Sequence, residues 1–235
     1  MRLSKRDLIG IGSFVVVLAA IIVLIGYRGG WNRFMMAPEP QEVAVSVAAT
    51  PVDPDNEGRR VSVQGQLLAD KPPEDSEFGF VATNSIVLDR RVEMYQWLEE
   101  CIDGACTQRM AWSDKWIDSS KFSNPTEHRN PDKFPVETAR FVGEGIHIGA
   151  FEPDIELLVA AIGMKPRPIK NDELSANLAA SFSIFGNELL SGSDSLHPAV
   201  GDLRIRYFEL PSAVATVIGI QKSAQLVPLP RTYGQ

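Results

Sequence analysis

Two cysteines, Cys101 and Cys106, are the residues whose type and spacing suggest the most specific chemistry in this 235-residue chain. They enclose the dipeptide Asp103-Gly104 between strand-like flanks, which is a strong signal for a two-residue β-hairpin turn. With that turn, the two cysteines fall directly opposite each other at the closer, non-hydrogen-bonded position of the hairpin. Their Cα atoms then lie within reach of a disulfide. We predict an intrachain disulfide in an oxidising compartment, with two free thiols as the alternative.

The same hairpin register pairs aromatic side chains across the two strands. It sets Trp97 against Met110 and Tyr95 against Trp112 on one face. Because such a ladder is usually buried, we expect this face to belong to the core. A groove lined by Tyr95, Trp97 and Trp112 is also the place where an apolar lipid or a peptide would bind, if the domain has such a ligand.

A polar loop, Asn124–Pro131, gathers side chains that could do acid–base chemistry. It contains Glu127, His128 and Arg129, and an enzyme site could combine them with Asp202. We favour a structural role for the loop, because Asn-Pro steps initiate turns and one histidine without an identifiable partner is not a catalytic constellation. The sequence has no nucleophile elbow and no dinucleotide-binding or phosphate-binding glycine loop. We predict that the protein is not an enzyme.

Metal and cofactor binding are not expected either. Three scattered histidines and no further cysteine leave the hairpin pair without a zinc set: His128, His147 and His197. Gly143-Glu144-Gly145 resembles a fragment of a glycine-rich loop, but it lies inside a predicted strand, where glycine more often marks a bulge or a close backbone approach. We predict no catalytic residue, no metal ligand and no cofactor.

The chain is acidic, with 30 Asp and Glu against 23 Lys and Arg and a formal net charge of −7. Non-specific nucleic-acid binding depends on clustered basic residues, and no such cluster occurs in the sequence. We therefore do not expect nucleic acid as a partner. The length allows one domain of ordinary size plus a membrane segment.

One segment, residues 8–27, is predicted to cross a membrane. It has no charged side chain, and about 20 residues at a rise of 1.5 Å span roughly 30 Å, the hydrocarbon thickness of a bilayer. Arg2, Lys5 and Arg6 favour a cytoplasmic location for the short tail, residues 1–7. A cleaved signal peptide is the rival interpretation, but the apolar run is longer than usual and no convincing cleavage site follows it. The lipid bilayer is thus the first expected partner.

Beyond the anchor we expect a juxtamembrane linker, residues 28–41, and then one β-rich domain, residues 42–235. Helix signatures occur at Pro153–Gly163, which proline opens and glycine closes, and more weakly at Asn171–Ala179. Alternating apolar residues predict strands at Val43–Val47, Val61–Leu67, Ser85–Trp97, Gln108–Trp116, Ala139–Ile148, Phe182–Leu190, Leu203–Leu210 and Val214–Gln221. The expected fold class is α+β: a β-rich extramembrane domain with one or two short helices, preceded by a single N-terminal transmembrane helix.

With these segments in view, the chain resembles the transmembrane protein 43 family, also called LUMA. The resemblance covers roughly Asn56 to Pro228, in blocks that agree in order and approximate spacing. Arg91–Trp97 is the most specific block. The motif positions, all of unknown role in the family, are Asn56, Glu57, Gly58, Arg59, Glu93, Met94, Tyr95, Gln96, Trp97, Trp116, His128, Asn130, Pro131, Gly201, Asp202 and Arg204.

The resemblance implies a large domain in the lumen of the endoplasmic reticulum and nuclear envelope of a eukaryote, or in the periplasm of a bacterium. Family members are regarded as scaffolds that associate with themselves and with other membrane or envelope proteins. The family continues into C-terminal transmembrane helices, whereas this sequence ends at Gln235, so we expect a form truncated before those helices, either a fragment or a natural short form. The cysteine pair is not part of the family pattern.

Three functions follow from these observations. A non-enzymatic, membrane-anchored scaffold that organises protein complexes at an envelope or endomembrane is the leading hypothesis. The alternative is lipid or peptide binding by the extramembrane domain. An uncharacterised hydrolase, built from the scattered polar residues of the loop and Asp202, is the third.

Overall fold

The computed structural model describes residues 43–192, 194 and 196–229. The predicted cytoplasmic tail (1–7), anchor helix (8–27) and linker (28–41) lie outside these residues. Within the described part, no helix is both long enough and apolar enough to cross a membrane. All described residues fall within the range 42–235, for which the sequence predicts a β-rich extramembrane domain.

One sheet is built around the antiparallel pair β2 (Arg60–Leu68) and β14 (Val214–Lys222). Its other strands are β1 (Val45–Val47), β8 (His147–Ile148), β9 (Glu152–Pro153) and β15 (Gln225–Val227). The strand order is β1-β2-β14-β15-β9, and β8 also pairs with β2. β1 runs parallel to β2, and β9 runs parallel to β15.

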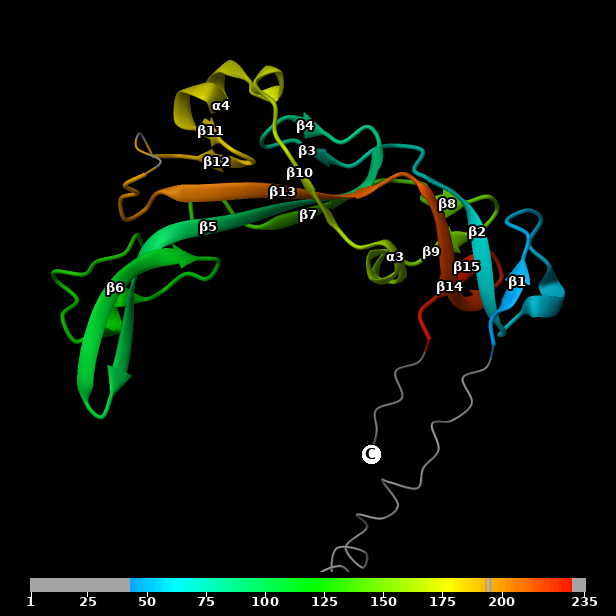
Figure 1. Ribbon diagram of the computed structural model, residues 1–235, viewed down its shortest axis with the longest axis horizontal. Coiled ribbons are helices and arrows are strands. Elements are labelled where there is room, and N and C mark those ends of the chain that lie inside the picture. Colours follow the sequence, from blue (N-terminus) through cyan, green and yellow to red (C-terminus); the bar gives the residue numbers. More distant parts are fainter. Residues whose placement is uncertain (1–42, 193, 195, 230–235) are drawn as a thin grey trace, which may run out of the picture. The chain divides into compact units, whose positions relative to one another are not determined.

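A second, seven-stranded sheet is built around β5 (Ser85–Ile102) and β13 (Leu203–Pro211), which run antiparallel side by side (Figure 1). The remaining strands are β6 (Ala105–Ser113), β7 (Ala139–Val142), β10 (Lys165–Arg167), β11 (Ser183–Phe185) and β12 (Glu188–Leu190). The order is β11-β12-β13-β5-β6, with β10 also on β13 and β7 also on β5.

The rest of the regular structure is short. β3 (Glu74–Asp75) and β4 (Phe80–Val81) form a small two-stranded sheet. The helices are α3 (Ile155–Ile162) and α4 (Ala176–Ser181), with single 3₁₀ turns at η1 (Pro54–Asn56), η2 (Ser119–Lys121) and η3 (Asn171–Glu173). The domain is β-rich with few short helices, as an α+β fold predicts.

β5 contributes to both hydrophobic clusters of the domain. Ile86 and Val87 belong to the first, together with side chains of β2, β14 and α3. Leu88, Val92 and Met94 belong to the second, together with side chains of β4, β12 and β13. Because successive side chains of a strand alternate between faces, the even-numbered positions from Leu88 onward share one buried face. This one long strand therefore positions side chains in two cores and continues beyond both.

Several predicted strands differ from the structure in extent. The strand predicted at Gln108–Trp116 is β6, which starts at Ala105 and ends at Ser113, so Trp116 lies in the loop that follows. The segment Phe182–Leu190 is two strands, because Gly186 turns the chain with φ +61°.

The single strand predicted at Ala139–Ile148 is also wrong, since it is split into β7 and β8. Gly143 and Gly145 separate the two. A Cβ on Gly143 would lie 2.8 Å from the carbonyl oxygen of Lys71, and Gly145 has φ +62°. Glycine here permits the close backbone approach that the sequence suggested, but at the cost of strand continuity.

Both predicted helices begin later than expected. Pro153 lies in β9, and Asp154 is the N-cap of α3 because its Oδ1 accepts hydrogen bonds from the backbone N–H groups of Glu156 (2.8 Å) and Leu157 (3.3 Å). The segment Asn171–Ala179 is not one helix. It divides into η3 and α4, because the Ser175 side chain caps a new helix by accepting from the N–H of Leu178.

Candidate functional site

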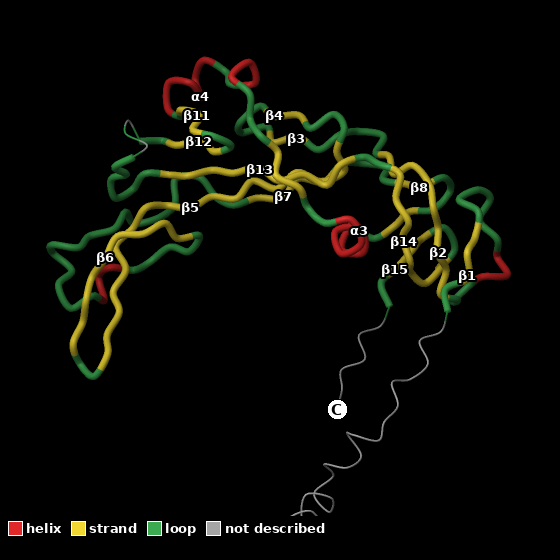
Figure 2. The backbone as a smooth tube through the Cα atoms, in the orientation of Figure 1, coloured by secondary structure: helices red, strands yellow, loops and turns green. Residues whose placement is uncertain are grey.

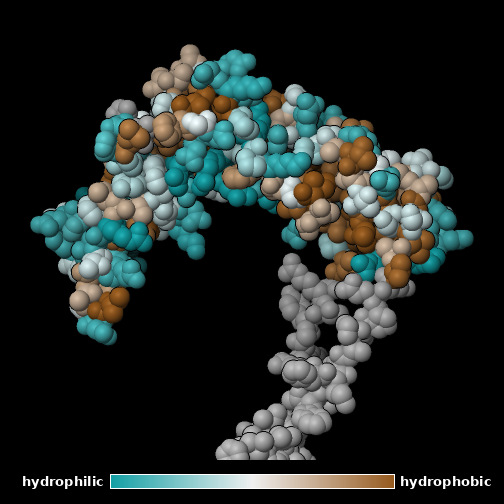
Figure 3. Space-filling view, in the orientation of Figure 1, coloured by the Kyte–Doolittle hydropathy of each residue, from teal (hydrophilic) through white to brown (hydrophobic). Residues whose placement is uncertain are grey.

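The β5–β6 hairpin has the predicted register. Asp103 and Gly104 form its turn, both with positive φ, and Cys101 lies opposite Cys106. Trp97 pairs with Met110 and Tyr95 pairs with Trp112, as expected. The two cysteine sulfurs are at bonding distance, 2.04 Å apart, so the hairpin is cross-linked close to its tip. Figure 3 shows a small apolar patch near this tip, where Ile102 is 67% exposed.

The aromatic face of the hairpin is not core, which corrects the prediction. Tyr95, Trp97 and Trp112 are half-buried, and Met110 is 43% exposed. The buried face of β5 is the opposite one, where Met94 and Gln96 have no exposed surface. An aromatic ladder can stabilise a hairpin by cross-strand contact without forming a core. The Tyr95 and Trp112 rings are 5.3 Å apart, and the Arg204 guanidinium lies 4.7 Å from the Trp112 ring.

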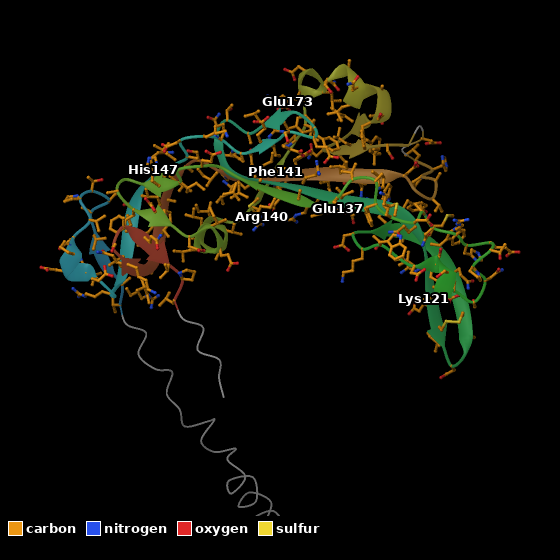
Figure 4. The ribbon with its side chains drawn as sticks, turned by 180° about the vertical axis from the view of Figure 1, so that it is seen from behind. Lys121, Glu137, Arg140, Phe141, His147 and Glu173 are labelled. Atoms are coloured by element: carbon orange, nitrogen blue, oxygen red, sulfur yellow. A yellow bond between two sulfur atoms is a disulfide. The ribbon has the colours of Figure 1, made fainter. Side chains whose placement is uncertain are left out.

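A loop folds around β5 at the base of the hairpin. We call residues 114–131 the clasp. It leaves β6 at Ser113, includes the 3₁₀ turn η2, and lies beside the hairpin as a mostly irregular segment (Figure 2). Lys121, labelled in Figure 4, ends η2. The clasp contacts β5 at three consecutive levels, and family-motif residues make most of these contacts.

Gln96 makes the first contact, on the buried face of β5. Its side-chain amide donates to the carbonyl oxygen of Lys115 (2.9 Å), and its Oε1 accepts from the backbone N–H of Ile117 (3.1 Å). Both polar ends of a fully buried amide are therefore satisfied by the clasp backbone. This fixes where the clasp crosses the strand.

Asn130 makes the second contact, along the edge of β5. Its Oδ1 accepts from the N–H of Trp97 (2.8 Å), and its Nδ2 donates to the carbonyl oxygens of Trp97 (3.0 Å) and Ile117 (3.3 Å). The backbone N–H of Asn130 donates to the Ser119 hydroxyl (2.9 Å). One side-chain amide thus replaces a neighbouring strand at Trp97, just beyond the point where pairing with β13 ends.

The third contact lies on the aromatic face, which faces away from Gln96. The His128 ring packs edge-on against Trp97 with centroids 4.3 Å apart. Two residues further along β5, Glu99 accepts hydrogen bonds from the N–H and the hydroxyl of Ser123 and from the side-chain amide of Gln108. The Ser123 hydrogen bond is the main reason that the pKa of Glu99 is lowered. Glu99 is thus a contact between β5 and the clasp.

Trp116, Pro131, Gly201 and Asp202 complete the base of the hairpin. The Trp116 indole N–H donates to the carbonyl oxygen of Pro131 (2.8 Å), although the side chain is 46% exposed. Tyr95 continues the β5–β13 pairing beyond β13, because its N–H donates to the carbonyl oxygen of Asp202 and its carbonyl accepts from the N–H of Gly201. A Cβ on Gly201, which has φ +100°, would meet Pro131 at 3.3 Å.

Glu93 and Arg204 form an ion pair between β5 and β13. The Arg204 Nε donates to the Glu93 carboxylate at 2.9 Å, and Arg206 also contacts this carboxylate. Met94, the remaining motif residue of this region, is buried in the second cluster. The motif residues from Glu93 to Arg204 are therefore gathered around one part of β5.

A second motif group, Asn56–Arg59, lies at the start of β2. The Arg59 guanidinium donates to Asn56 Oδ1 (3.2 Å), the N–H of Gly58 donates to the carbonyl of Gln221 (2.9 Å), and the Glu57 carboxylate accepts from the N–H of Ser223 (2.7 Å). Gly58 has φ +73°, which favours glycine. These residues fix the η1 turn to β14. In the described part of the chain, no hydrogen bond or ion pair joins this group to the hairpin group.

A buried ionic network was not found from the sequence. Asp75 is fully buried and accepts from both Arg90 Nη1 (2.8 and 3.0 Å) and the Tyr207 hydroxyl (2.6 Å). Burial opposes the charge on Arg90, yet Asp75 and the exposed Glu77 raise its pKa. Burial, with the hydrogen bond to Asp75, raises the pKa of Tyr207. Figure 4 shows Glu137, whose carbonyl accepts from Arg90 Nε, and Phe141, whose ring lies 5.7 Å from the Arg90 guanidinium.

The polar residues considered for an enzyme site do not converge. His128 packs on Trp97, Glu127 accepts from Asn124, Arg129 lies 3.6 Å from Asp132, and Asp202 accepts from the N–H of Ala199. The clasp borders a depression of about 410 Å³ whose charged lining is Asp118, Arg129 and Asp132.

One group of side chains is close enough together to hold a metal ion, but two of its members form a disulfide. Glu99, Cys101 and Cys106 have ligand atoms within 4.8 Å of one another. The two sulfurs are joined to each other, however, and a disulfide does not supply the thiolates that a zinc site needs.

Comparison with known proteins gives a consistent family match. A family model described as Transmembrane protein 43 matches residues 94–234. The chain is 30% identical to human Transmembrane protein 43 over an alignment that covers 95% of this chain and 62% of the relative. It is 28% identical to the Transmembrane protein 43 homolog of Drosophila melanogaster, with 73% of this chain and 49% of the relative covered. The chain thus spans about half to three fifths of the length of these relatives. No solved structure matches it.

Proposed function

Because this chain belongs to the transmembrane protein 43 family, we propose that it is a non-enzymatic, membrane-anchored scaffold that organises protein complexes through its β-rich domain. Its partners are the lipid bilayer, through residues 8–27, other membrane or envelope proteins, and further copies of itself. Nucleic acid is not a partner, given the net charge of −7. In this proposal the chain has no catalytic residue, metal or cofactor.

One observation carries the proposal: three family-motif side chains of the hairpin region, Gln96, Asn130 and Trp116, bind backbone atoms. Gln96 and Asn130 bond to backbone atoms of the clasp and of β5, and Trp116 bonds to the backbone of Pro131. A catalytic site needs titratable groups that converge on a space for substrate. A hairpin that binds a protein partner instead needs a fixed backbone, because rigidity before binding lowers the conformational entropy lost on association. The motif residues meet the second requirement.

Ligand binding in the aromatic groove is less well supported. Trp97 is in contact with His128, and Trp112 is in contact with Tyr95 and Arg204. These rings already have partners within the domain, so an apolar ligand would have to displace them.

The proposal includes a topology. Arg2, Lys5 and Arg6 favour a cytoplasmic N-terminus, so the β-rich domain would lie in the periplasm of a bacterium or in the lumen of the endoplasmic reticulum and nuclear envelope of a eukaryote. Protease-protection mapping tests this placement. Accessibility of the N-terminal tail and the main domain from the same side would contradict it.

The scaffold role is tested by affinity capture from membranes after brief chemical cross-linking. The full-length native gene product is compared with two variants, Asn130→Ala, which opens the clasp, and Asn124→Ala in the same loop. The Asn124 side chain donates to Glu127 and makes no hydrogen bond to β5 in the described part of the chain, so it is a matched control for the loss of an asparagine side chain. We expect Asn130→Ala to lose captured proteins that wild type and Asn124→Ala retain. Equal capture by all three would contradict a scaffold that works through the hairpin.

A further inference from the structure

The outer edge of β6 is an open row of backbone donors and acceptors. β6 is the last strand of the seven-stranded sheet. Cys106, Gln108, Met110 and Trp112 stand at non-hydrogen-bonded positions opposite β5, so their backbone N–H and C=O groups point away from it. Among the described residues, these outward groups have no hydrogen-bond partner.

Apart from the single charge of Arg109, this edge lacks the features that usually prevent strands from pairing with one another. Proteins protect edges by making them short, by placing proline, lysine or a bulge in them, or by covering them. β1 and β11 have three residues each, and the free edge of β5 is closed by Asp202 at Tyr95 and by Asn130 at Trp97. β6 has nine residues without proline or lysine, and it pairs with β5 without a register shift.

The strand is also suited to pairing with itself. In an antiparallel pair of two β6 strands, outward residues must face outward residues, so the two-fold axis must pass through a residue and not between two residues. A centre on Arg109 would set this residue, the single charge of β6, against itself, and like charges directly opposite are destabilising. A centre on Met110 sets Arg109 opposite Ala111 and Thr107 opposite Ser113. It also brings the two exposed Met110 side chains together.

A two-fold axis through Gln108 is less favourable. It would place Trp112 of one strand opposite Gly104 of the other, which lies in the turn beyond the end of β6. The disulfide and the clasp hold the hairpin in shape before it meets a partner, so little further ordering is required.

We infer that β6 pairs antiparallel with β6 of a second copy of this chain, about a two-fold axis through Met110, and so extends the sheet across two molecules. This inference rests on the proposed scaffold function and names the partner of the hairpin. It uses the same strand-addition principle by which extended peptides join sheet edges.

Site-specific disulfide formation tests the register. The full chain is expressed in membranes with Cys101→Ser and Cys106→Ser, so that each chain has one introduced thiol. One form has Thr107→Cys and the other has Ser113→Cys; both positions leave Arg109 in place. We expect a disulfide-linked dimer when the two forms are co-expressed and mildly oxidised, because these positions are directly opposed and about 4.5 Å apart in the proposed ladder. Neither form alone should cross-link. Dimers in no combination, or equally in all three, would overturn the inference.

A proline substitution tests whether the backbone edge is responsible. Met110→Pro removes an outward N–H, and no bond to β5 is lost, because proline is tolerated where a strand's N–H faces solvent. Met110→Ala is the control that shortens the side chain and keeps the N–H. Loss of the cross-link with proline and its retention with alanine support strand pairing. Retention with both variants overturns it.

The outcomes also separate this inference from the scaffold proposal. If the thiol pair does not cross-link, yet capture of other membrane proteins depends on Asn130 and not on Asn124, then self-pairing is wrong and the scaffold role stands. If cross-linking is found but capture does not depend on Asn130, self-pairing is supported and the wider scaffold role is wrong.

Discussion

Two polar networks lie along β5, one around Arg90 and one around Gln96 and Asn130, and they are built from different chemistry. Arg90, Asp75 and Tyr207 form an ionic network inside the second hydrophobic cluster, where each member is almost fully buried. Gln96 and Asn130 are neutral amides whose partners are backbone atoms of the strand and the clasp.

The difference indicates two roles. A buried charge must be paired or it costs several kcal/mol, so the Arg90 network is an all-or-none element of the core. A neutral amide bonded to backbone orders a local segment, and its loss exposes that segment without leaving a charge in the core. The Arg90 network therefore anchors β5 in the core of the domain. The Gln96 and Asn130 network orders β5 and the clasp at the base of the hairpin.

The largest effect is expected at Asp75. Asp75→Ala removes the buried partner of Arg90, leaving only its contact with the exposed Glu77, and leaves Tyr207 without its acceptor. We therefore predict a loss of about 3–5 kcal/mol in the free energy of unfolding. Denaturant titration of the full chain, followed by circular dichroism, measures it. Glu77→Ala is the control, because Glu77 contacts Arg90 from the surface and should cost less than about 1 kcal/mol. Equal costs for the two variants would remove the basis for treating this network as part of the core.

A smaller and more local effect is expected at Asn130. Asn130→Ala removes the partner of the Trp97 N–H and C=O, which we expect to cost about 1–3 kcal/mol. Amide exchange at Trp97 should become faster, whereas exchange at Val92 in the core should change little. Asn124→Ala should change neither. If Asn130→Ala costs more than Asp75→Ala, the ranking of the two networks is reversed.

The disulfide should contribute less again. The loop between Cys101 and Cys106 is short, so closing it removes limited chain entropy, and the double serine variant should lose about 2 kcal/mol at most. Trp97→Ala should lower the melting temperature more, because it removes the ring that contacts His128. Mass spectrometry of unreduced protein from the oxidising compartment should find no free thiol. Two free thiols would contradict the bond itself.

The smallest expected effect is a pH dependence at Glu99. Its pKa is lowered in the folded protein, chiefly by the hydrogen bond from Ser123, so the ionised carboxylate stabilises the clasp. This contribution is present above the ordinary pKa of glutamate, about 4.3, and is lost as pH falls through the lower, folded value. Unfolding midpoints measured at about four pH values between roughly pH 6 and pH 3 should show a loss of stability at low pH. The Glu99→Gln variant should not show this loss. Ser123→Ala, which removes the hydroxyl that donates to Glu99, should reduce this loss.

The hairpin could be predicted from the sequence because its signal is local. The dipeptide Asp103-Gly104 sets the turn, and alternation then determines every pair from Cys101 to Trp112. Arg90 and Gln96 carried a local signal as well, since both continue the buried period-two series of Leu88, Val92 and Met94. A charged or polar residue within such a series can be predicted to be buried and to need a polar partner. This rule would have identified both Arg90 and Gln96 as buried residues.

The partners themselves could not be predicted, because they come from distant segments. Asp75 meets Tyr207 across more than half of the chain, and Asn130 reaches Trp97 through an irregular loop with no periodicity. The aromatic ladder was assigned to the core because pattern alone does not say which face of a strand is covered. The second hydrophobic cluster, which includes side chains of β4 and α4, decides that, and Met94 belongs to it.

Met94 in β5 has two pairing partners that lie at unequal distances along the chain, which has a consequence during synthesis. Met94 pairs with Ser113 on one side and with Leu203 on the other. Because a chain leaves the ribosome from its N-terminus, β6 and the clasp can close on β5 long before β13 is made. During that interval the residues of β5 that await β13 form an exposed edge, which is prone to aggregation. Asn130 is available early and covers Trp97, the part of the edge that β13 does not reach. A nascent chain that stops before Leu203 should therefore depend on chaperones, whereas one that extends past Pro211 should not.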